Sequence, residues 1–410
     1  MYLLLAPENV FGKIPPKWPL ISEEVKFTNN VAYCPKFYWR KWHLAQGCKD
    51  ISPAWFKKLR KTRQLTNILV IATGGIGDVL WTMPFVKALR KKFPRSKILI
   101  ATEERTMPVW RGTPYADLCV KDEFWNLQSL IRNAEEVYDF GGVATMFKDQ
   151  MKKDPIQAIF EVGDLPLPKD RKDLRPQLVV TIDEGKQMQA KLKEEGLDIK
   201  KDKIVSIAVA SSTPNRDWPF SYTVKLTNLL LEKGYKVIWL GEDKHFEHAY
   251  VMKCDCGWES IFKSLTDKLD FTFKCPKCSS DNKVSKEEIS AGLLNLCGKT
   301  NLRQVMATIA LSDLYIGPNS GLMVIATALE IPTIGLFGAF DPALRTKFYD
   351  KFQAVWGKVE CSPCNEHWTE CKYGHPAPCM KVIEPHRILS AAEEMIIKYP
   401  RNKIGKEPIE

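Results

Sequence analysis

A glycine-rich turn carrying a carboxylate is the first group of residues suited to chemistry. Gly74-Gly75-Ile76-Gly77-Asp78 lies between an apolar strand expected at 67–72 and a helix expected at 78–93. Glycines let a backbone turn sharply and approach a ligand closely, and the amides at a helix N-terminus attract anions. Asp78 then has two interpretations. It either caps its own helix or serves as a general base.

A second junction of this kind lies near residue 320. The segment 317–322 follows an expected strand at 314–316 and opens a helix expected at 320–329. Ser320 and Gly321 would place backbone amides and a hydroxyl at the helix start, an arrangement that can hold a diphosphate. The alternative is an ordinary capped helix without a ligand.

A polar loop with a guanidinium follows another expected strand, at 204–209. It runs from Ser211 to Pro219 and contains Ser212 and Arg216. Open α/β sheets bind ligands at the carboxyl ends of their strands, and arginine makes bidentate contacts to phosphate. The alternative for Arg216 is a surface ion pair.

Two clusters of cysteines suggest metal. The segment 253–285 contains two closely spaced pairs of cysteines, which predict a closed, structural zinc site in a zinc-ribbon-like insert. The four expected ligands are Cys254, Cys256, Cys275 and Cys278. Free thiols are the alternative.

The second cysteine cluster lies in the segment 355–384. Its members are Cys361, Cys364, Cys371 and Cys379. Zinc, an iron–sulfur cluster and reduced thiols all fit this spacing.

Alternating strands and helices must position these groups. The pattern begins at Asn67 and starts again after a Pro-rich boundary near 165–176, which predicts two α/β units. We therefore expect an aromatic and basic extension at 1–66, a Rossmann-like domain at 67–175 and a second one at 176–410. The extension is either a surface for an acidic partner or a solvated basic rim beside an aromatic anchor.

Composition limits the class of protein. The 410 residues are 45% hydrophobic and 27% charged, which is typical of an ordinary globular chain, and the net charge is +11. There is no apolar run of 18 residues, and the N-terminus lacks a basic segment ahead of its short apolar run, so we expect a cytoplasmic protein without a membrane span. The positive charge favours anionic partners.

Taken together in this order, the motifs resemble glycosyltransferase family 9, which contains the ADP-heptose:lipopolysaccharide heptosyltransferases. The resemblance is carried by segments 68–84, 216–219, 297–302, 312–323, 331–333 and 336–342. It implies a GT-B fold of two Rossmann-like domains facing a cleft, with the acceptor on the first and the nucleotide-sugar on the second. It further implies an inverting reaction without a catalytic metal.

The resemblance also implies roles for individual residues. Asp78 matches the catalytic base, and Gly75 and Gly77 line the acceptor side of the cleft. The donor residues on the second domain are Ser212, Arg216, Glu242, Asn319, Ser320, Gly321 and Leu322. Arg216 stands where the family usually has a lysine that neutralises the leaving diphosphate.

Two positions depart from the family pattern Asp-x-Gly-x-x-His at the diphosphate helix. Asn319 replaces the aspartate and Val324 replaces the histidine. An amide still hydrogen-bonds sugar hydroxyls, whereas valine cannot donate to phosphate. ADP-heptose is therefore not assumed as the donor, and loss of transferase activity is an alternative outcome.

The sequence thus predicts an inverting glycosyltransferase that moves a sugar from a nucleotide-diphospho-sugar to a hydroxyl of a glycan or small molecule. A first alternative is a glycosyltransferase acting on modified nucleic acid, motivated by the insert and the positive charge. A second is a catalytically reduced binding module that uses the zinc insert to hold nucleic acid or a protein.

Overall fold

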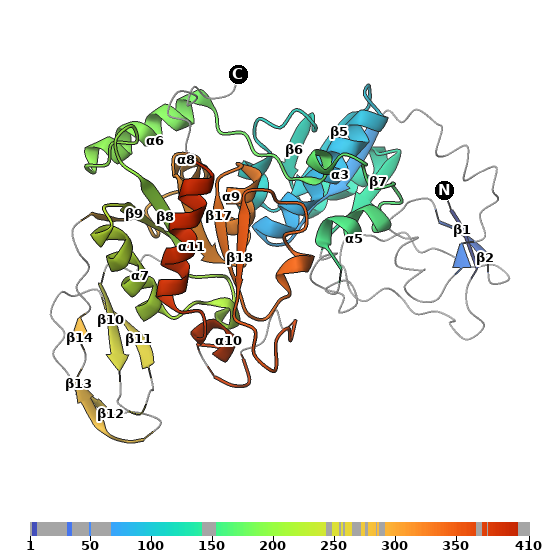
Figure 1. Cartoon of the computed structure of the whole chain (residues 1–410). Helices are drawn as coiled ribbons and strands as arrows, with labels where there is room; N and C mark the ends of the chain where they lie inside the picture. The colour runs from blue at the N-terminus through green and yellow to red at the C-terminus, as the bar shows by residue number, and fades with distance from the viewer. Residues whose placement is uncertain are drawn as a thin grey trace. The chain divides into compact units, whose positions relative to one another are not determined.

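The computed structural model divides the chain into two compact units, Met1–Gln177 and Leu178–Glu410 (Figure 1). The structure describes residues 2–5, 31–34, 49–50, 67–141, 153–242, 248–253, 256, 259–264, 272–274, 278–283, 285–286, 292–365, 371–374 and 376–400. Most of the predicted extension at 1–66 lies outside these residues. Its described part is an antiparallel sheet in the order β2-β1-β3, formed by β1 (Tyr2–Leu5), β2 (Val31–Cys34) and β3 (Lys49–Asp50).

The first unit is built on a parallel sheet with the strand order β6-β5-β4-β7. The strands are β4 (Asn67–Ile71), β5 (Lys97–Thr102), β6 (Leu118–Lys121) and β7 (Glu136–Asp139). The helices are α3 (Ile76–Lys92), η1 (Glu104–Trp110), α4 (Phe124–Asn133), α5 (Pro155–Val162) and η3 (Arg171–Leu174). The strand-turn-helix unit expected near Gly74 is present as β4 and α3. Helices α4 and α5 were not anticipated.

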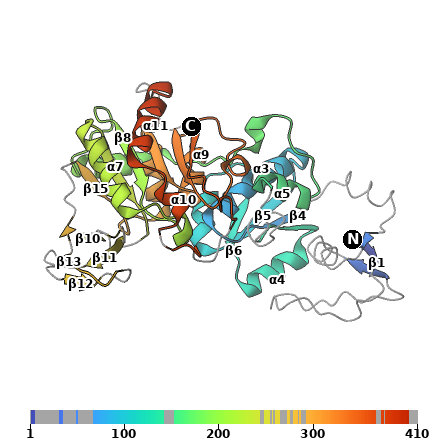
Figure 2. The same cartoon turned by 60° about the horizontal axis from the view of Figure 1, so that its bottom comes forward.

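An aromatic cluster joins α3 to its neighbours in this unit. Phe85 of α3 is fully buried and meets the rings of Tyr138, Phe140 and Phe160 edge-on, with centroids 4.8–5.4 Å apart. A Cβ atom at Gly163 would come within 2.1 Å of the Phe85 ring, so the chain after α5 needs glycine there. Helices α3 and α5 therefore pack side by side (Figure 2).

The second unit contains a six-stranded parallel sheet in the order β15-β9-β8-β16-β17-β18. Its strands are β8 (Ile204–Ala208), β9 (Lys236–Leu240), β15 (Leu293–Asn295), β16 (Leu314–Pro318), β17 (Thr333–Phe337) and β18 (Phe352–Trp356). Its helices are α6 (Ile182–Glu194), η4 (Pro214–Arg216), α7 (Phe220–Glu232), α8 (Leu302–Ala310), α9 (Gly321–Ala328), η5 (Pro342–Leu344), α10 (Pro378–Lys381) and α11 (Pro385–Lys398). Helix α6 and strand β18 were not predicted.

Helices cover both faces of this sheet. Alternate strand residues such as Val205, Ile207, Val237 and Trp239 form one core with α7 and α11, which contact each other. Helix α8 packs against both α6 and α9. Strands of a sheet that is covered on both faces have nearly continuous apolar sequences, and the strands of this sheet have such sequences.

The insert between β9 and β15 is antiparallel, unlike the sheet that it interrupts. One piece has the order β11-β10-β14 and the other pairs β12 with β13. The strands are β10 (His248–Lys253), β11 (Glu259–Ser264), β12 (Thr272–Lys274), β13 (Asp281–Lys283) and β14 (Ser285–Lys286). Antiparallel β-structure therefore begins a few residues before the predicted insert start at 253.

Candidate functional site

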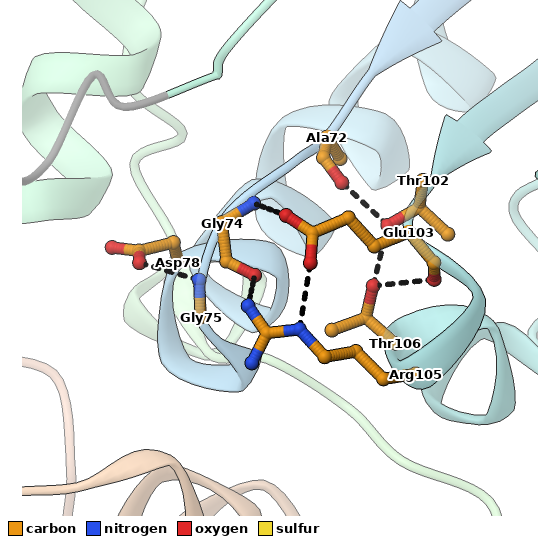
Figure 3. A network of polar contacts seen from close by, with 8 residues as sticks. All are labelled: Ala72, Gly74, Gly75, Asp78, Thr102, Glu103, Arg105 and Thr106. Carbon is orange, nitrogen blue, oxygen red and sulfur yellow. Dashed lines mark hydrogen bonds and ion pairs between the residues drawn. The ribbon is translucent and has the colours of Figure 1, made fainter. Parts of the chain in front are cut away.

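The glycine turn of the first unit fixes the carboxylate of Asp78. Gly74 has φ +122°, a conformation that side chains rarely adopt, and Gly75 is the extended N-cap of α3. The Gly75 N–H donates to Asp78 Oδ2 at 2.9 Å. The other carboxyl oxygen points away from Gly75 (Figure 3). The capping role expected for Asp78 is present, and it occupies only one of the two oxygens.

Glu103 and Arg105 hold the same turn from the segment that follows the neighbouring strand β5. The Gly74 N–H donates to Glu103 Oε1 at 3.1 Å, and Arg105 Nε donates to Glu103 Oε2 at 2.6 Å (Figure 3). Arg105 Nη2 also donates to the Gly74 carbonyl at 3.1 Å. Sequence reasoning missed both residues. The sequence signal that could have indicated them is the charged run Glu103-Glu104-Arg105, shortly after the strand expected at 97–101.

Two buried threonines tie the ends of the strands that carry this network. Thr102 Oγ1 donates to the Ala72 carbonyl at 2.5 Å and lies 2.7 Å from Thr106 Oγ1. Thr106 Oγ1 contacts the Glu103 carbonyl at 2.9 Å. Both threonines are fully buried, so the carboxyl ends of β4 and β5 are held in a fixed register around Glu103.

The polar loop after β8 in the second unit is shaped by its own side chains. Asp217 Oδ1 accepts hydrogen bonds from the Ser211 N–H at 2.6 Å and from Ser211 Oγ at 2.9 Å. The short helix η4 places Arg216 at its end. Trp218 donates from Nε1 to the Ile383 carbonyl at 2.9 Å, which anchors the loop to the C-terminal segment.

Arg216 joins this loop to the start of α9. Its Nε donates to Thr213 Oγ1 at 2.5 Å, its Nη1 to the Asn319 carbonyl at 2.7 Å and its Nη2 to Ser212 Oγ at 2.8 Å. The residue is only 7% exposed, so the surface ion pair considered for it is wrong. Arg216 instead brings a buried positive charge and the Ser212 hydroxyl to the same place.

The start of α9 packs closely on the strand before it. Asn319 is buried and its N–H donates to the Leu336 carbonyl at 3.1 Å, while Ser320 is the N-cap of the helix. A Cβ atom at Gly317 would lie 2.6 Å from the hydroxyl of the fully buried Tyr315. Burial raises the pKa of Tyr315, which keeps this phenol neutral.

Strand order gathers the predicted donor residues at one sheet edge. Strands β9, β8 and β16 are adjacent and parallel, so their carboxyl ends meet. Exposed Glu242 follows β9, Ser212 follows β8, and Asn319 follows β16. Gly321 and Leu322 are half-buried in the first turn of α9, whereas Val324 is buried in that helix. The edge can thus offer a carboxylate, a hydroxyl and helix-start amides to a ligand.

Comparison with known sequences decides the family. The family model "Glycosyltransferase family 9 (heptosyltransferase)" matches residues 148–374, more than half of the chain. The chain belongs to glycosyltransferase family 9. The match includes the donor residues of the second unit, whereas Asp78 lies outside it.

Relatives of this family 9 chain agree with the match. The lipooligosaccharide heptosyltransferase 2 of Campylobacter jejuni serotype O:6 is 21% identical over 337 residues, which cover 78% of this chain and 96% of that protein. A solved family 9 glycosyltransferase from Veillonella parvula aligns at TM-score 0.59 and 16% identity, covering 82% of this chain and 99% of its own.

A second solved structure, E. coli ADP-heptose lps heptosyltransferase II, aligns at TM-score 0.55 and 16% identity, covering 81% of this chain and 99% of its own. These likenesses show the GT-B-like α/β fold with parallel sheets. Within the described part of the family 9 chain, no helix is both long enough and apolar enough to cross a membrane.

The C-terminal cysteines of the family 9 chain gather around Cys379 in α10. Burial raises the pKa of the Cys379 thiol, and neighbouring Cys364, Cys371 and Cys361 raise it further. Among the described residues, no three His, Cys, Asp or Glu side chains are arranged to hold a metal ion. All four of these cysteines are described, whereas residues 366–370 and 375 of the segment 355–384 are not, so the metal predicted for this segment stays a prediction.

The predicted zinc ligands of the insert are described only in part. Cys256 and Cys278 are described: Cys256 is half-buried, and the exposed Cys278 has its Sγ 3.0 Å from Ser280 Oγ. Cys254 and Cys275 lie outside the described residues. The four-cysteine site therefore stays a prediction.

Proposed function

We propose that this family 9 chain transfers a sugar from a nucleotide-diphospho-sugar to a hydroxyl of a glycan or small-molecule acceptor, with inversion at the anomeric carbon. Relatives at the sequence level are named heptosyltransferases, and one solved relative is named for ADP-heptose. ADP-heptose is therefore the first donor to test. The proposed acceptor unit is the first one, and the proposed donor unit is the second.

The link between Arg216 and Asn319 carries the donor assignment. It joins two polar loops at the carboxyl edge of the sheet, where α/β proteins bind nucleotides. Ser212 Oγ accepts from Arg216, so the hydroxyl proton of Ser212 can be donated to an anion. A departing diphosphate would thus meet the Ser212 hydroxyl, the amides of Ser320 and Gly321, and the buried charge of Arg216.

Asp78 is the proposed base. The acceptor oxygen forms a bond to the anomeric carbon while the bond from that carbon to the diphosphate oxygen breaks. The electron pair leaves with the nucleoside diphosphate, and the Asp78 carboxylate takes the acceptor proton. Anchoring one carboxyl oxygen on the Gly75 N–H gives the other a defined direction.

Asn319 and Val324 set limits on the donor. The Asn319 side chain is a neutral amide and the Val324 side chain is apolar and buried, so neither supplies a charge to the diphosphate. This places the electrostatic stabilisation of the leaving group mainly on Arg216. Glu242, exposed after β9, is the proposed partner of ribose hydroxyls.

The deciding experiment combines binding with turnover. The purified chain is tested with a panel of nucleotide-sugars, ADP-heptose first, for thermal stabilisation and for release of nucleoside diphosphate. We expect at least one donor to stabilise the chain and to be turned over with a hydroxylated acceptor, and Asp78→Asn to abolish turnover but not binding. If no donor stabilises the protein, the proposal is wrong.

We also propose a structural zinc in the insert. The proposal is supported by the chain between β10 and β11, which contains Cys254 and Cys256, and by the chain between β12 and β13, which contains Cys275 and Cys278. Two antiparallel hairpins that each carry a cysteine pair are typical of a closed four-thiolate site.

A further inference from the structure

Two consecutive backbone amides each bind a carboxylate from a different element. The Gly75 N–H donates to Asp78 Oδ2 at 2.9 Å, and the Gly74 N–H donates to Glu103 Oε1 at 3.1 Å. Asp78 belongs to α3, whereas Glu103 follows β5. The Gly74 N–H belongs to the peptide before Gly74 and the Gly75 N–H to the peptide after it, so the backbone conformation of Gly74 couples the position of Glu103 to that of Asp78 (Figure 3).

Arg105 completes the hold on Gly74. It donates to the second carboxyl oxygen of Glu103 at 2.6 Å and to the Gly74 carbonyl at 3.1 Å. Both polar backbone groups of Gly74 are thus bound by one ion pair. A glycine at φ +122° has no side chain to limit its backbone, so its conformation depends on such external contacts.

This arrangement is more than a surface ion pair. Exposed ion pairs generally contribute little, and the Arg105 side chain is 61% exposed. Here, however, the Glu103 backbone is fixed by the buried Thr106, whose hydroxyl contacts the Glu103 carbonyl. The contacts of the pair are to the backbone of the turn, so losing the pair releases the turn.

We propose that Glu103 and Arg105 are positioning residues for sugar transfer, and that they hold the Gly74–Gly75 turn so that the Asp78 carboxylate is directed at the acceptor hydroxyl. This inference rests on the proposed function, because it takes Asp78 as the base. Neither residue needs to touch the substrate for this role. A displacement of about 1 Å in a reacting group can cost on the order of 100-fold in rate.

The pair also sets the charge around the base. While Glu103 and Arg105 are paired, their two opposite charges lie side by side and carry no net charge. Removing only Glu103 leaves a positive charge, which lowers the pKa of a nearby carboxyl, and removing only Arg105 leaves a negative charge, which raises it.

Other charged groups lie around the turn and on the elements packed against α3. Burial raises the pKa of Asp122 and Glu103 raises it further, so this carboxyl also responds to Glu103→Gln. Lys121 pairs with Glu104 and Glu123. On the elements packed against α3, Asp173 pairs with Lys87 and Lys91. On α5 itself, Glu161 pairs with Lys153.

The first experiment needs no substrate. Hydrogen exchange of the peptide containing Gly74 and Gly75 is compared between the unaltered chain, Glu103→Ala and Arg105→Met. We expect about tenfold faster exchange in both variants. In Glu103→Ala the Gly74 N–H loses its acceptor, and in Arg105→Met that acceptor loses the guanidinium that holds it. The matched control Glu161→Gln breaks the exposed pair with Lys153 on α5 and should leave this peptide unchanged. Unchanged exchange in Glu103→Ala would overturn the positioning role.

The second experiment measures kinetics against pH with the donor found above. For Glu103→Gln and Arg105→Met we expect kcat to fall by about 10-fold to 100-fold, with the donor KM within about twofold. In the plot of kcat/KM against pH, the acid limb should move to lower pH in Glu103→Gln and to higher pH in Arg105→Met. In the double variant the limb should lie near its original position. Shifts in the same direction, or none, would contradict the proposal.

Different results would contradict the proposed base and the proposed positioning role. Retention of turnover in Asp78→Asn would overturn the proposed base, whatever the exchange data show. Loss of turnover in Asp78→Asn together with unchanged kinetics in Glu103→Gln and Arg105→Met would remove the positioning role alone.

Discussion

Arg216 and Asn319 are 103 residues apart in the chain and are joined by a 2.7 Å hydrogen bond from Nη1 to the backbone carbonyl. The bond connects the loop after β8 to the residue before the N-cap of α9. A single buried guanidinium therefore fixes the relative position of the two loops proposed to hold the donor.

Replacing Arg216 should affect stability and donor binding together. In Arg216→Met, the Asn319 carbonyl, Thr213 and Ser212 lose their charged donor, and we expect the free energy of unfolding to fall by about 2–3 kcal/mol. Denaturant unfolding and nucleotide-sugar-induced thermal shifts measure the two effects. Arg387→Met, at an exposed position of α11, is the matched control and should change neither. Arg216→Met with unaltered stability would contradict the bridging role.

Asp78→Asn separates capping from catalysis. The amide oxygen can still accept from the Gly75 N–H, so the fold should be retained, whereas loss of the base should lower kcat by about 100-fold to 10,000-fold. Steady-state kinetics and a thermal unfolding curve check this. Asp170→Asn provides the control, because Asp170 also caps a helix, accepting from the Lys172 N–H, but lies at η3. Equal kinetic losses in the two variants would argue against Asp78 as base.

Two glycine substitutions should have opposite effects. Gly74→Ala forces a side chain into φ +122° and places Cβ 3.1 Å from Asp78 Oδ2, so we expect a loss of about 1–3 kcal/mol in the free energy of unfolding. Gly185 lies inside α6 with open space around its Cβ position, and Gly185→Ala should stabilise by about 0.5–1 kcal/mol. Thermal unfolding of both variants distinguishes the required glycine from the replaceable one.

The Glu184–Arg303 pair should make stability depend on pH. Arg303 donates to both carboxyl oxygens of Glu184 and holds the pKa of Glu184 at about 2, below its ordinary value of 4.5. A depressed pKa stabilises the folded state above pH 4.5, and this contribution is lost as the pH falls from about 4.5 towards about 2. Because both side chains are largely buried and hydrogen bonds to charged groups contribute more than exposed ion pairs, we expect Glu184→Gln to remove about 1–2 kcal/mol at pH 7.

Urea unfolding at several pH values tests this linkage. Between pH 5 and 3 the unaltered chain should lose stability more steeply than Glu184→Gln. Glu161→Gln, in the exposed pair with Lys153, should follow the unaltered chain. Parallel curves for the unaltered chain and Glu184→Gln would show that the pair does not contribute to acid sensitivity.

Metal analysis tests the zinc proposed for the insert. The purified full chain should contain about one zinc ion, and substituting serine for Cys256 and Cys278 together should remove it. Serine at Cys119, a half-buried thiol of β6, is the control and should keep the metal. A full chain purified without zinc, yet with the same fold, would contradict the proposal.

Much of the fold was predictable because its signals are local. The apolar segment at 67–72 and the glycine turn after it indicated β4 and α3, and the Ser320–Gly321 junction indicated the start of α9. Helix α6 was missed although Thr181 and Glu184 form a capping box at its start. Most of its residues are polar, so only Met188 and Leu192 mark its buried face, and its packing on α8 could not be read from the sequence.

The candidate site was predictable only where its residues are neighbours in the chain. Asp78 and Gly75 are three residues apart, so their contact follows from helix-start geometry. Glu103 is 29 residues from Gly74, and nothing in the local sequence pairs them. Their contact exists because β4 and β5 are adjacent parallel strands whose carboxyl ends lie together.

The sequence by itself therefore determined which residue types stand at each strand end, because glycines, caps and apolar periodicity act over a few residues. Only the tertiary structure decided their partners. Strand order brings Glu103 and Arg105 to Gly74, and burial turns Arg216 from a candidate surface cation into the link with Asn319. Such contacts depend on packing between segments far apart in the chain, which no local pattern encodes.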